Sequence, residues 1–149
     1  MQWTLFTFRE LNTDQLYELL RLRADVFVVE QNCVYGDLDG KDATALHLLG
    51  RSDSGSLAAY ARILPPGKDG LPIIGRVVTP PEERGKGTGH ELMRQALSAI
   101  ERTYGDRRSK LEAQSHLEKF YAGHGFVRQG ADHLLDGIPH VDMVLSAPR

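Results

Sequence analysis

The sequence predicts a protein of the α/β or α+β class, with helices packed around a mixed β-sheet. Short alternating segments and longer segments of helical periodicity follow one another in the order β-α-β-β-β-α-β-α-β-β. The chain has 149 residues, a length that suits one hydrophobic core. Its 41% hydrophobic and 26% charged residues are ordinary for a globular protein. We therefore expect residues 1–149 to form a single domain.

The first strand and the first helix are expected within residues 1–31. Residues 2–9 alternate apolar and polar side chains, as a half-buried strand does. Residues 11–31 have helical periodicity, with Asn12 or Thr13 as the expected N-cap. The buried face of this helix is predicted to carry Leu16, Leu19, Leu20, Arg23 and Phe27.

A hairpin and a further strand follow an acidic loop. Residues 32–42 are rich in turn formers and aspartate, which predicts a loop. Residues 46–52 and 56–64 read as strands, and the turn formers at 53–55 join them in a predicted β-hairpin. After another loop rich in proline and glycine, the apolar run at 73–79 predicts a fourth strand.

The second half of the chain begins with a glycine-rich turn that opens a helix. This helix is predicted to direct toward the core Leu92, Met93, Ala96, Leu97 and Ile100. The remaining expected elements are a strand at 110–114, a short helix within 115–126 that ends at glycine, and strands at 126–130 and 138–146. The last strand also offers an edge for pairing across a homodimer.

Composition argues against several classes of function. With 18 basic and 20 acidic residues, the formal net charge of −2 gives no global field to recruit nucleic acid or a membrane surface. No apolar run approaches the roughly 18 residues of a membrane span, and we see no signal peptide. The single cysteine, Cys33, fits a reducing cytoplasm. His140 and Asp142 share one strand face, but two ligands are too few for a metal site, so we expect no metal.

The stretch TPPEERGKGTGHELM carries the strongest chemical signal. Gly85, Gly87 and Gly89 stand at alternate positions between a strand and a helix. Glycine lets backbone N–H groups approach a ligand closely, and a helix N-terminus supplies unpaired donors with partial positive charge. Arg84 and Lys86 add local cationic charge. The pattern predicts an anion cradle, whereas a charged surface turn is the structural alternative.

The string RVVTPPEERGKGTGHELM resembles the acetyl-CoA loop of the GCN5-related N-acetyltransferases (GNAT). The resemblance implies the GNAT fold, a mixed, mostly antiparallel sheet of six to seven strands that splays between strands 4 and 5. It implies acetyl-CoA as the cosubstrate, with the pantetheine arm paired to Val77 and Thr79. The backbone amides that would hold the pyrophosphate are those of Arg84, Gly85, Lys86, Gly87, Thr88 and Gly89.

The segment LEAQSHLEKFYAGHGF resembles the second conserved region of the same family. The family often places a tyrosine on this short helix beside the departing sulfur, and Tyr121 occupies that place. The resemblance therefore implies that Tyr121 binds the cofactor and acts as the general acid. Helical spacing shared with Leu117 and Phe120 leaves a second interpretation, in which Tyr121 is a core residue.

The general base is not obvious. Many members of the family carry an acidic residue on the strand before the glycine loop, whereas this strand carries Arg76 and no carboxylate. His116, beside Gln114 at the end of a strand, titrates in the right range and is expected near the cleft, unless it only supports a helix terminus. Glu30 and His47 are weaker candidates, and each has a structural alternative as a solvated side chain.

The segments at 20–42, 60–64, 73–78, 113–126 and 136–143 together resemble the ElaA-like branch of the superfamily. On the acceptor side we expect Glu30, Gln114, His47 and Arg23. Arg23 lies on the apolar face of its helix, so an ion pair with Glu30, Asp37 or Asp39 is favoured, with the acceptor cleft as the alternative. The acidic loop either attracts a cationic amine or is simply solvated.

The sequence thus predicts an acetyl-CoA-dependent N-acetyltransferase acting on a primary amine of a small molecule or peptide. The amine is expected to attack the thioester directly in a ternary complex, because no residue is dedicated to activating Cys33 as a covalent carrier. A non-catalytic acetyl-CoA sensor or partner-binding module is the alternative, kept open by the missing strand carboxylate. The identity of the acceptor and the length of the acyl chain stay open.

Overall fold

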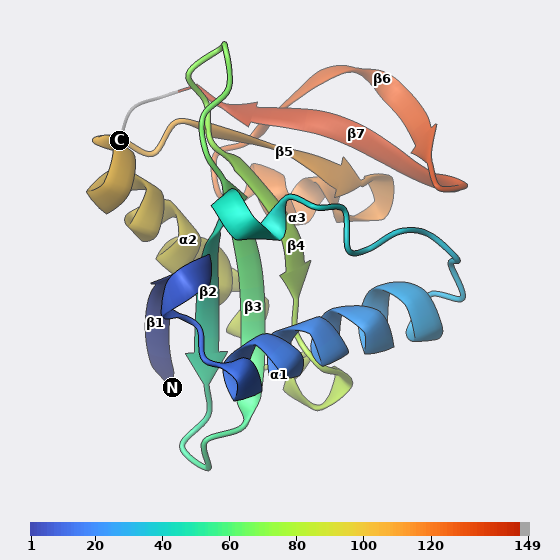
Figure 1. Cartoon of the computed structure of the whole chain (residues 1–149). Helices are drawn as coiled ribbons and strands as arrows, with labels where there is room; N and C mark the ends of the chain where they lie inside the picture. Colours follow the sequence, from blue (N-terminus) through green and yellow to red (C-terminus); the bar gives the residue numbers. More distant parts are fainter. Residues whose placement is uncertain (147–149) are drawn as a thin grey trace.

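The computed structural model describes residues 1–146 and contains one seven-stranded mixed sheet with the order β1-β2-β3-β4-β5-β7-β6 (Figure 1). The strands are β1 (Gln2–Thr7), β2 (Leu46–Arg51), β3 (Leu57–Leu64), β4 (Ile73–Val78), β5 (Ser109–Gln114), β6 (Val127–Leu135) and β7 (Ile138–Leu145). The helices are α1 (Thr13–Arg23), α2 (Thr88–Tyr104) and α3 (Glu118–Ala122). All strand pairs are antiparallel except β4 with β5, so the predicted fold class and element order are confirmed.

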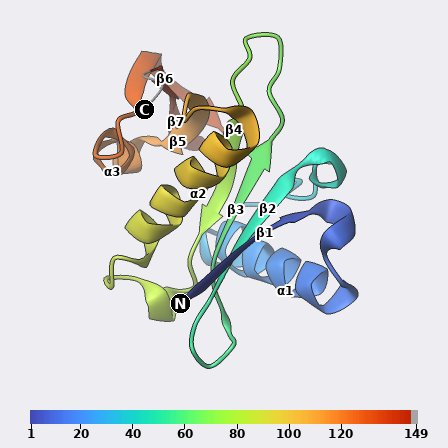
Figure 2. The same cartoon turned by 90° about the vertical axis from the view of Figure 1, so that its left-hand side faces the viewer.

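Helix α1 packs on one face of the sheet and α2 on the other (Figure 2), whereas β6 at the far edge is largely exposed. The strand period of two explains the division, since successive side chains of a strand point to opposite faces. Leu48 on β2 packs in the cluster that contains α2, whereas its neighbour Leu49 packs with Leu19 of α1. Among the residues of the structure, no helix is both long and apolar enough to cross a membrane.

The first helix differs from the sequence prediction in its second half. Asn12 is the N-cap as expected, since its side chain accepts a hydrogen bond from the Gln15 amide at 2.8 Å. The α-helix ends at Arg23 and continues as a π-helical segment, η2 (Ala24–Glu30). In this segment the Gln31 amide donates to the carbonyl of Val26, five residues earlier, at 3.2 Å.

The C-terminal hairpin corrects two expectations. β6 extends to Leu135 instead of ending near Gly130, because Asp136 and Gly137 form a two-residue turn in which both φ angles are positive, 52° and 76°. Positive φ at both positions is what a tight type I′ hairpin turn requires. β7 lies between β5 and β6, so both of its edges are already paired and it offers no edge for a dimer.

A bulge in β4 lies close to the place where β4 and β5 part. Tyr60 pairs with Val78 and Arg62 with Gly75, so β4 has one residue more than β3 between these pairs. The extra residue is Arg76, whose φ of 52° lies in the left-handed region. Beyond the bulge β4 leaves β5, and Ile73 with Lys110 is the pair that joins them. This is the splay expected between strands 4 and 5.

Three arginines and three aspartates form a buried network, in which the aspartates belong to the loop that precedes β2. Arg23, which is fully buried, donates from Nε to Asp37 at 2.9 Å and from Nη1 to Asp42 at 2.7 Å. The other arginines are Arg62, which binds Asp39 and Asp42, and Arg76, which binds Asp37 and Asp39. The acidic loop is thus neither simply solvated nor free to attract an amine, because the three arginines neutralise its carboxylates.

Replacing Arg23 by methionine should destabilise the fold by about 3–5 kcal/mol, because buried carboxylates lose a charged partner. Arg21→Met is the matched control: this side chain is exposed on the same helix, and its contact with Asp25 is 3.8 Å long. Urea denaturation measures both variants. Equal and small losses would mean that the network contributes little to stability.

Candidate active site

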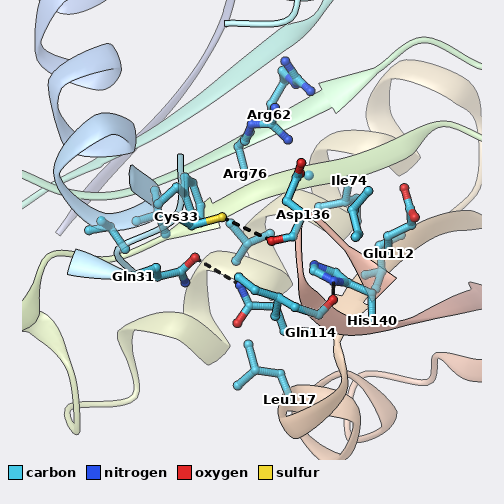
Figure 3. Close-up of a pocket in the computed structure, with 18 of the residues that line it drawn as sticks. Gln31, Cys33, Arg62, Ile74, Arg76, Glu112, Gln114, Leu117, Asp136 and His140 are labelled. Atoms are coloured by element: carbon cyan, nitrogen blue, oxygen red, sulfur yellow. Dashed lines mark hydrogen bonds between the residues drawn. The ribbon is translucent and has the colours of Figure 1, made fainter. Parts of the chain in front are cut away.

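A cleft of about 780 Å³ opens where β4 and β5 part. Its volume lies within the usual range of small-molecule sites. The walls come from η2 and the loop after it, β4, β5, α3 and the β6–β7 turn. Figure 3 shows Gln31 and Cys33 on one side reaching toward Gln114 and Asp136 on the other. The contacts are 3.4 Å between the Gln114 and Gln31 amides and 3.5 Å from Cys33 Sγ to the Asp136 carbonyl.

The glycine-rich loop has the geometry of an anion cradle. Gly85 and Gly87 both have left-handed φ angles, 77° and 80°, and Gly87 is the N-cap of α2. The first turn of α2 leaves its N–H groups without intrahelical acceptors, so they point out of the helix end. One expected donor is already used, because the Arg84 amide donates to the Pro81 carbonyl at 3.2 Å. The cradle therefore begins at Gly85.

The side chain of Arg84 is occupied as well. Its Nη1 and Nη2 atoms lie 2.6 and 2.9 Å from the two carboxylate oxygens of Glu30, a bidentate pair that joins η2 to the glycine loop. The Arg84 guanidinium lowers the pKa of Glu30. Glu30 and Arg84 both line the cleft, but a carboxylate held in this way is a poor proton acceptor.

Tyr121 lines the cleft from α3 with only 7% of its surface exposed. Burial raises the pKa of its phenol to about 12. The group is therefore protonated at neutral pH and able to donate a hydrogen bond to a developing thiolate. Because the phenol holds its proton tightly, it stabilises that charge as a donor rather than by transferring the proton completely.

The structure brings most of the predicted site residues to the cleft. Those that line it are Val77, Thr79, Arg84, Gly89, Tyr121, Gln114, His116 and Glu30. The glycine loop from Gly85 to Thr88 leads into α2, whose Gly89 reaches the cleft wall.

Two predicted acceptor-side residues lie elsewhere. Arg23 belongs to the buried network, with Asp37 as the partner among the expected carboxylates. His47 is fully buried, with Nδ1 2.7 Å from the Tyr60 hydroxyl and Nε2 2.9 Å from the Asp42 carbonyl. Burial lowers the pKa of His47, and both of its ring nitrogens are engaged. It therefore neither faces solvent nor reaches the cleft.

The cleft residues that were not among the predicted site residues include Glu112, Asp136 and His140. Glu112 and His140 alternate with buried residues on β5 and β7, and an alternating pattern alone does not tell which face meets a cleft. Asp136 precedes glycine between two apolar runs, a hairpin signal that would have placed it at a turn.

His140 and Asp142 share one face of β7 as expected, but the structure shows no hydrogen bond between them. The carboxylate of Asp142 lies instead beside His133, whose Nε2 is 3.9 Å from Asp142 and 3.1 Å from Glu112. Atoms of these three side chains lie within 4.8 Å of one another on neighbouring strands. Nε2 of His133 is within hydrogen-bond distance of Glu112 only, and all three side chains lie on the surface.

Three features together define an acyltransferase architecture. They are a mixed sheet whose strands part, a loop of glycines with left-handed φ angles at a helix N-terminus, and a buried tyrosine in the cleft. The chain belongs to the GNAT acetyltransferase family, since the model of the acetyltransferase (GNAT) domain matches residues 19–147. Membership implies transfer of an acyl group from acyl-CoA. The resemblance inferred from the glycine loop is thereby confirmed.

Similar proteins place the chain within one branch of that family. ElaA of Escherichia coli is 42% identical over 146 residues, covering 96% of this chain and 95% of ElaA. The crystal structure of ElaA superimposes with a TM-score of 0.89 over 97% of this chain and 99% of that one. An acyl-CoA N-acyltransferase from Pseudomonas aeruginosa is 42% identical, with a TM-score of 0.91 over 98% of this chain and 100% of its own. The ElaA-like resemblance is likewise confirmed.

Replacing Gly87 by alanine should weaken the binding of CoA by roughly tenfold or more, because a Cβ would stand among the amides of the cradle. A hydrogen bond to a charged group is worth about 1.5–3 kcal/mol, and 1.4 kcal/mol corresponds to a factor of ten. Isothermal titration with CoA measures the effect.

The matched control is Gly70→Ala. Gly70 also has a left-handed φ, 76°, and open space around its Cα, but it lies in the β3–β4 loop. Both variants should lose about 1–2 kcal/mol of stability through backbone strain, and Gly70→Ala should bind CoA normally. Equal CoA affinity in the two variants would show that this loop does not bind the cofactor.

Proposed function

We propose that the protein is an N-acetyltransferase that moves the acetyl group of acetyl-CoA to a primary amine of a small molecule or peptide. The single observation that carries the proposal is the placement of Tyr121 in the cleft between β4 and β5, next to the α2 N-terminus. The cleft thus leads from the anion cradle, past the parted strands, to a hydrogen-bond donor for the sulfur.

The donor side accounts for each part of the cofactor. The amides from Gly85 to Gly89 would face the pyrophosphate, where the α2 dipole favours negative charge. The backbone of Val77 and Thr79, freed from strand pairing by the bulge, would pair with the pantetheine arm. The thioester would then lie beside Tyr121, whose phenol is protonated at neutral pH.

The acceptor side favours a cation. Asp136 projects into the cleft from the β6–β7 turn, opposite Cys33 (Figure 3). Within residues 1–146, no arginine or lysine forms a salt bridge with its carboxylate. An ammonium group entering the cleft would meet this charge before it meets the thioester, which supports an amine as the acceptor.

Direct attack in a ternary complex is the simplest route. Cys33 is the one thiol of the chain, and its contact is with the Asp136 carbonyl at 3.5 Å. A carbonyl oxygen cannot remove a proton from a thiol to make the nucleophilic thiolate. This contact therefore gives no support to a covalent acetyl-cysteine intermediate.

A non-catalytic acetyl-CoA sensor is the second candidate, and one observation favours it. Many members of the family carry an acidic residue on the strand before the glycine loop, whereas β4 carries no carboxylate and its Arg76 binds Asp37 at 2.8 Å. A sensor would retain the glycine loop and would have no need of a base. Acetyl-CoA binding without thiol release across a broad panel of amines would support this candidate.

Release of free CoA thiol from acetyl-CoA, measured across a panel of amines and peptides, tests the proposed transfer. In this assay Tyr121→Phe should lower turnover by about 10²-fold and leave acetyl-CoA affinity nearly unchanged, because the hydroxyl acts on the leaving sulfur. Tyr104→Phe, at the far end of α2, is the control and should behave as the unaltered protein. Unchanged turnover in Tyr121→Phe would make Tyr121 a packing residue.

A further inference from the structure

An amine acceptor needs a base, and the cleft carboxylates near the glycine loop and the acidic loop are already neutralised. Alkylamines are mostly protonated at neutral pH, so one proton has to leave before the nitrogen can attack. Glu30 is bound by Arg84, and Asp39 is bound by both Arg62 and Arg76. Each pair stabilises the ionised carboxylate and so weakens it as a proton acceptor.

His140 occupies the part of the cleft wall next to the splay. It is half-buried on β7 and lines the cleft, and its direct cross-strand partner on β5 is Gln114. Directly paired residues of neighbouring strands point to the same face of a sheet, and the strands are about 4.8 Å apart. Gln114 ends β5 where it has left β4, so the imidazole lies one strand away from the expected position of the thioester.

The hydrogen bond of His140 fixes its tautomer. Nδ1 lies 2.7 Å from the carbonyl oxygen of Ile138, which can only accept, so Nδ1 carries the hydrogen. In the neutral ring Nε2 then has a free lone pair. A backbone carbonyl that holds one nitrogen of an imidazole in this way leaves the other ready to take up a proton.

Several titratable side chains surround the ring of His140. The titratable groups around it, element by element, are Glu112 on β5, His133 on β6, Asp142 on β7, Asp136 in the β6–β7 turn and Cys33 across the cleft. Arg62 and Arg76 line the same cleft, and both are paired with aspartates.

We infer that His140 is the general base for the acceptor amine, an assignment that rests on the proposed N-acetyltransferase function. Nε2 takes one proton from the ammonium group. The freed nitrogen lone pair attacks the thioester carbonyl carbon, and a C–N bond forms. The C–S bond then breaks, the sulfur leaves with its electron pair, and the nitrogen loses a second proton. One proton goes to the CoA thiolate and the other to solvent, so the amide, free thiol and one proton balance the reaction.

Asp136, Glu112 and His116 also line the cleft, and the carboxylate of Asp136 is assigned above to attracting the ammonium group. Glu112 is held by His133 at 3.1 Å and carries an exposed carboxylate. His116 also lines the cleft, but its ring is exposed, and within residues 1–146 no side-chain hydrogen bond fixes its tautomer. His140 combines cleft exposure, partial burial and a fixed proton on the opposite nitrogen.

The test compares His140→Gln with His133→Gln, its cross-strand neighbour outside the cleft, in the thiol-release assay. The probes are methoxylamine, which is largely unprotonated at neutral pH, and the more basic glycine ethyl ester, benzylamine and ethylamine. His140→Gln should lower turnover of ethylamine by about 10²-fold and leave that of methoxylamine nearly unchanged, with a graded loss between them. Raising the pH should restore the activity of His140→Gln toward the basic amines. His133→Gln should match the unaltered protein with every probe.

The outcomes separate this assignment from the proposed function. Thermal melts and acetyl-CoA titration first establish that His140→Gln folds and binds the cofactor. An equal loss for all amines, no loss, or a loss that appears in Glu112→Gln or His116→Gln in place of His140→Gln would overturn the assignment to His140. Acetyl-CoA binding by the unaltered protein with no turnover of any probe would likewise overturn it. Failure of the unaltered protein to bind acetyl-CoA would instead overturn the proposed function itself.

Discussion

The buried ion network of Arg23, Arg62 and Arg76 is the constraint on which the cleft depends. A guanidinium in a protein interior is costly unless charged partners surround it, so each arginine requires the loop that carries the aspartates. Because the arginines come from α1, β3 and β4, the loop is tied to three elements at once. Asp37 receives two of these arginines and is almost fully buried. One wall of the cleft is thereby fixed without apolar packing.

The same network sustains the distortion that opens the sheet. Arg76 sits in the left-handed region at a cost of about 1–3 kcal/mol for a residue with a side chain. Its hydrogen bonds to the carboxylate and the carbonyl of Asp37, at 2.8 and 3.1 Å, hold it there. The bulge frees the backbone groups of β4 that a cofactor arm would need. The acidic loop, the β4 bulge and the splay of the sheet are therefore linked through Arg76.

The sequence predicted the glycine turn at the start of α2 and the short helix that carries Tyr121, because these signals are local. Gly85 and Gly87 are adjacent to the helix that they open, and Tyr121 lies within one short motif. The acceptor side is assembled from distant segments, as the contact between Cys33 and Asp136 across 103 positions shows. Arg23 on an apolar face correctly indicated a buried ion pair. The choice of Asp37 over Glu30 depended on where Arg84 lies in space, which no local pattern contains.

The π-helical segment after α1 sets the direction in which Glu30 and Gln31 point on the cleft wall. A π turn accommodates one residue more than an α turn, and it is commonly found at functional sites. Removing one residue from Ala24–Glu30 would restore α geometry and rotate everything that follows by about 100°. Glu30 and Gln31 would then turn away from Arg84 and Gln114. The direction of this cleft wall thus depends on the wider turn of the π-helical segment.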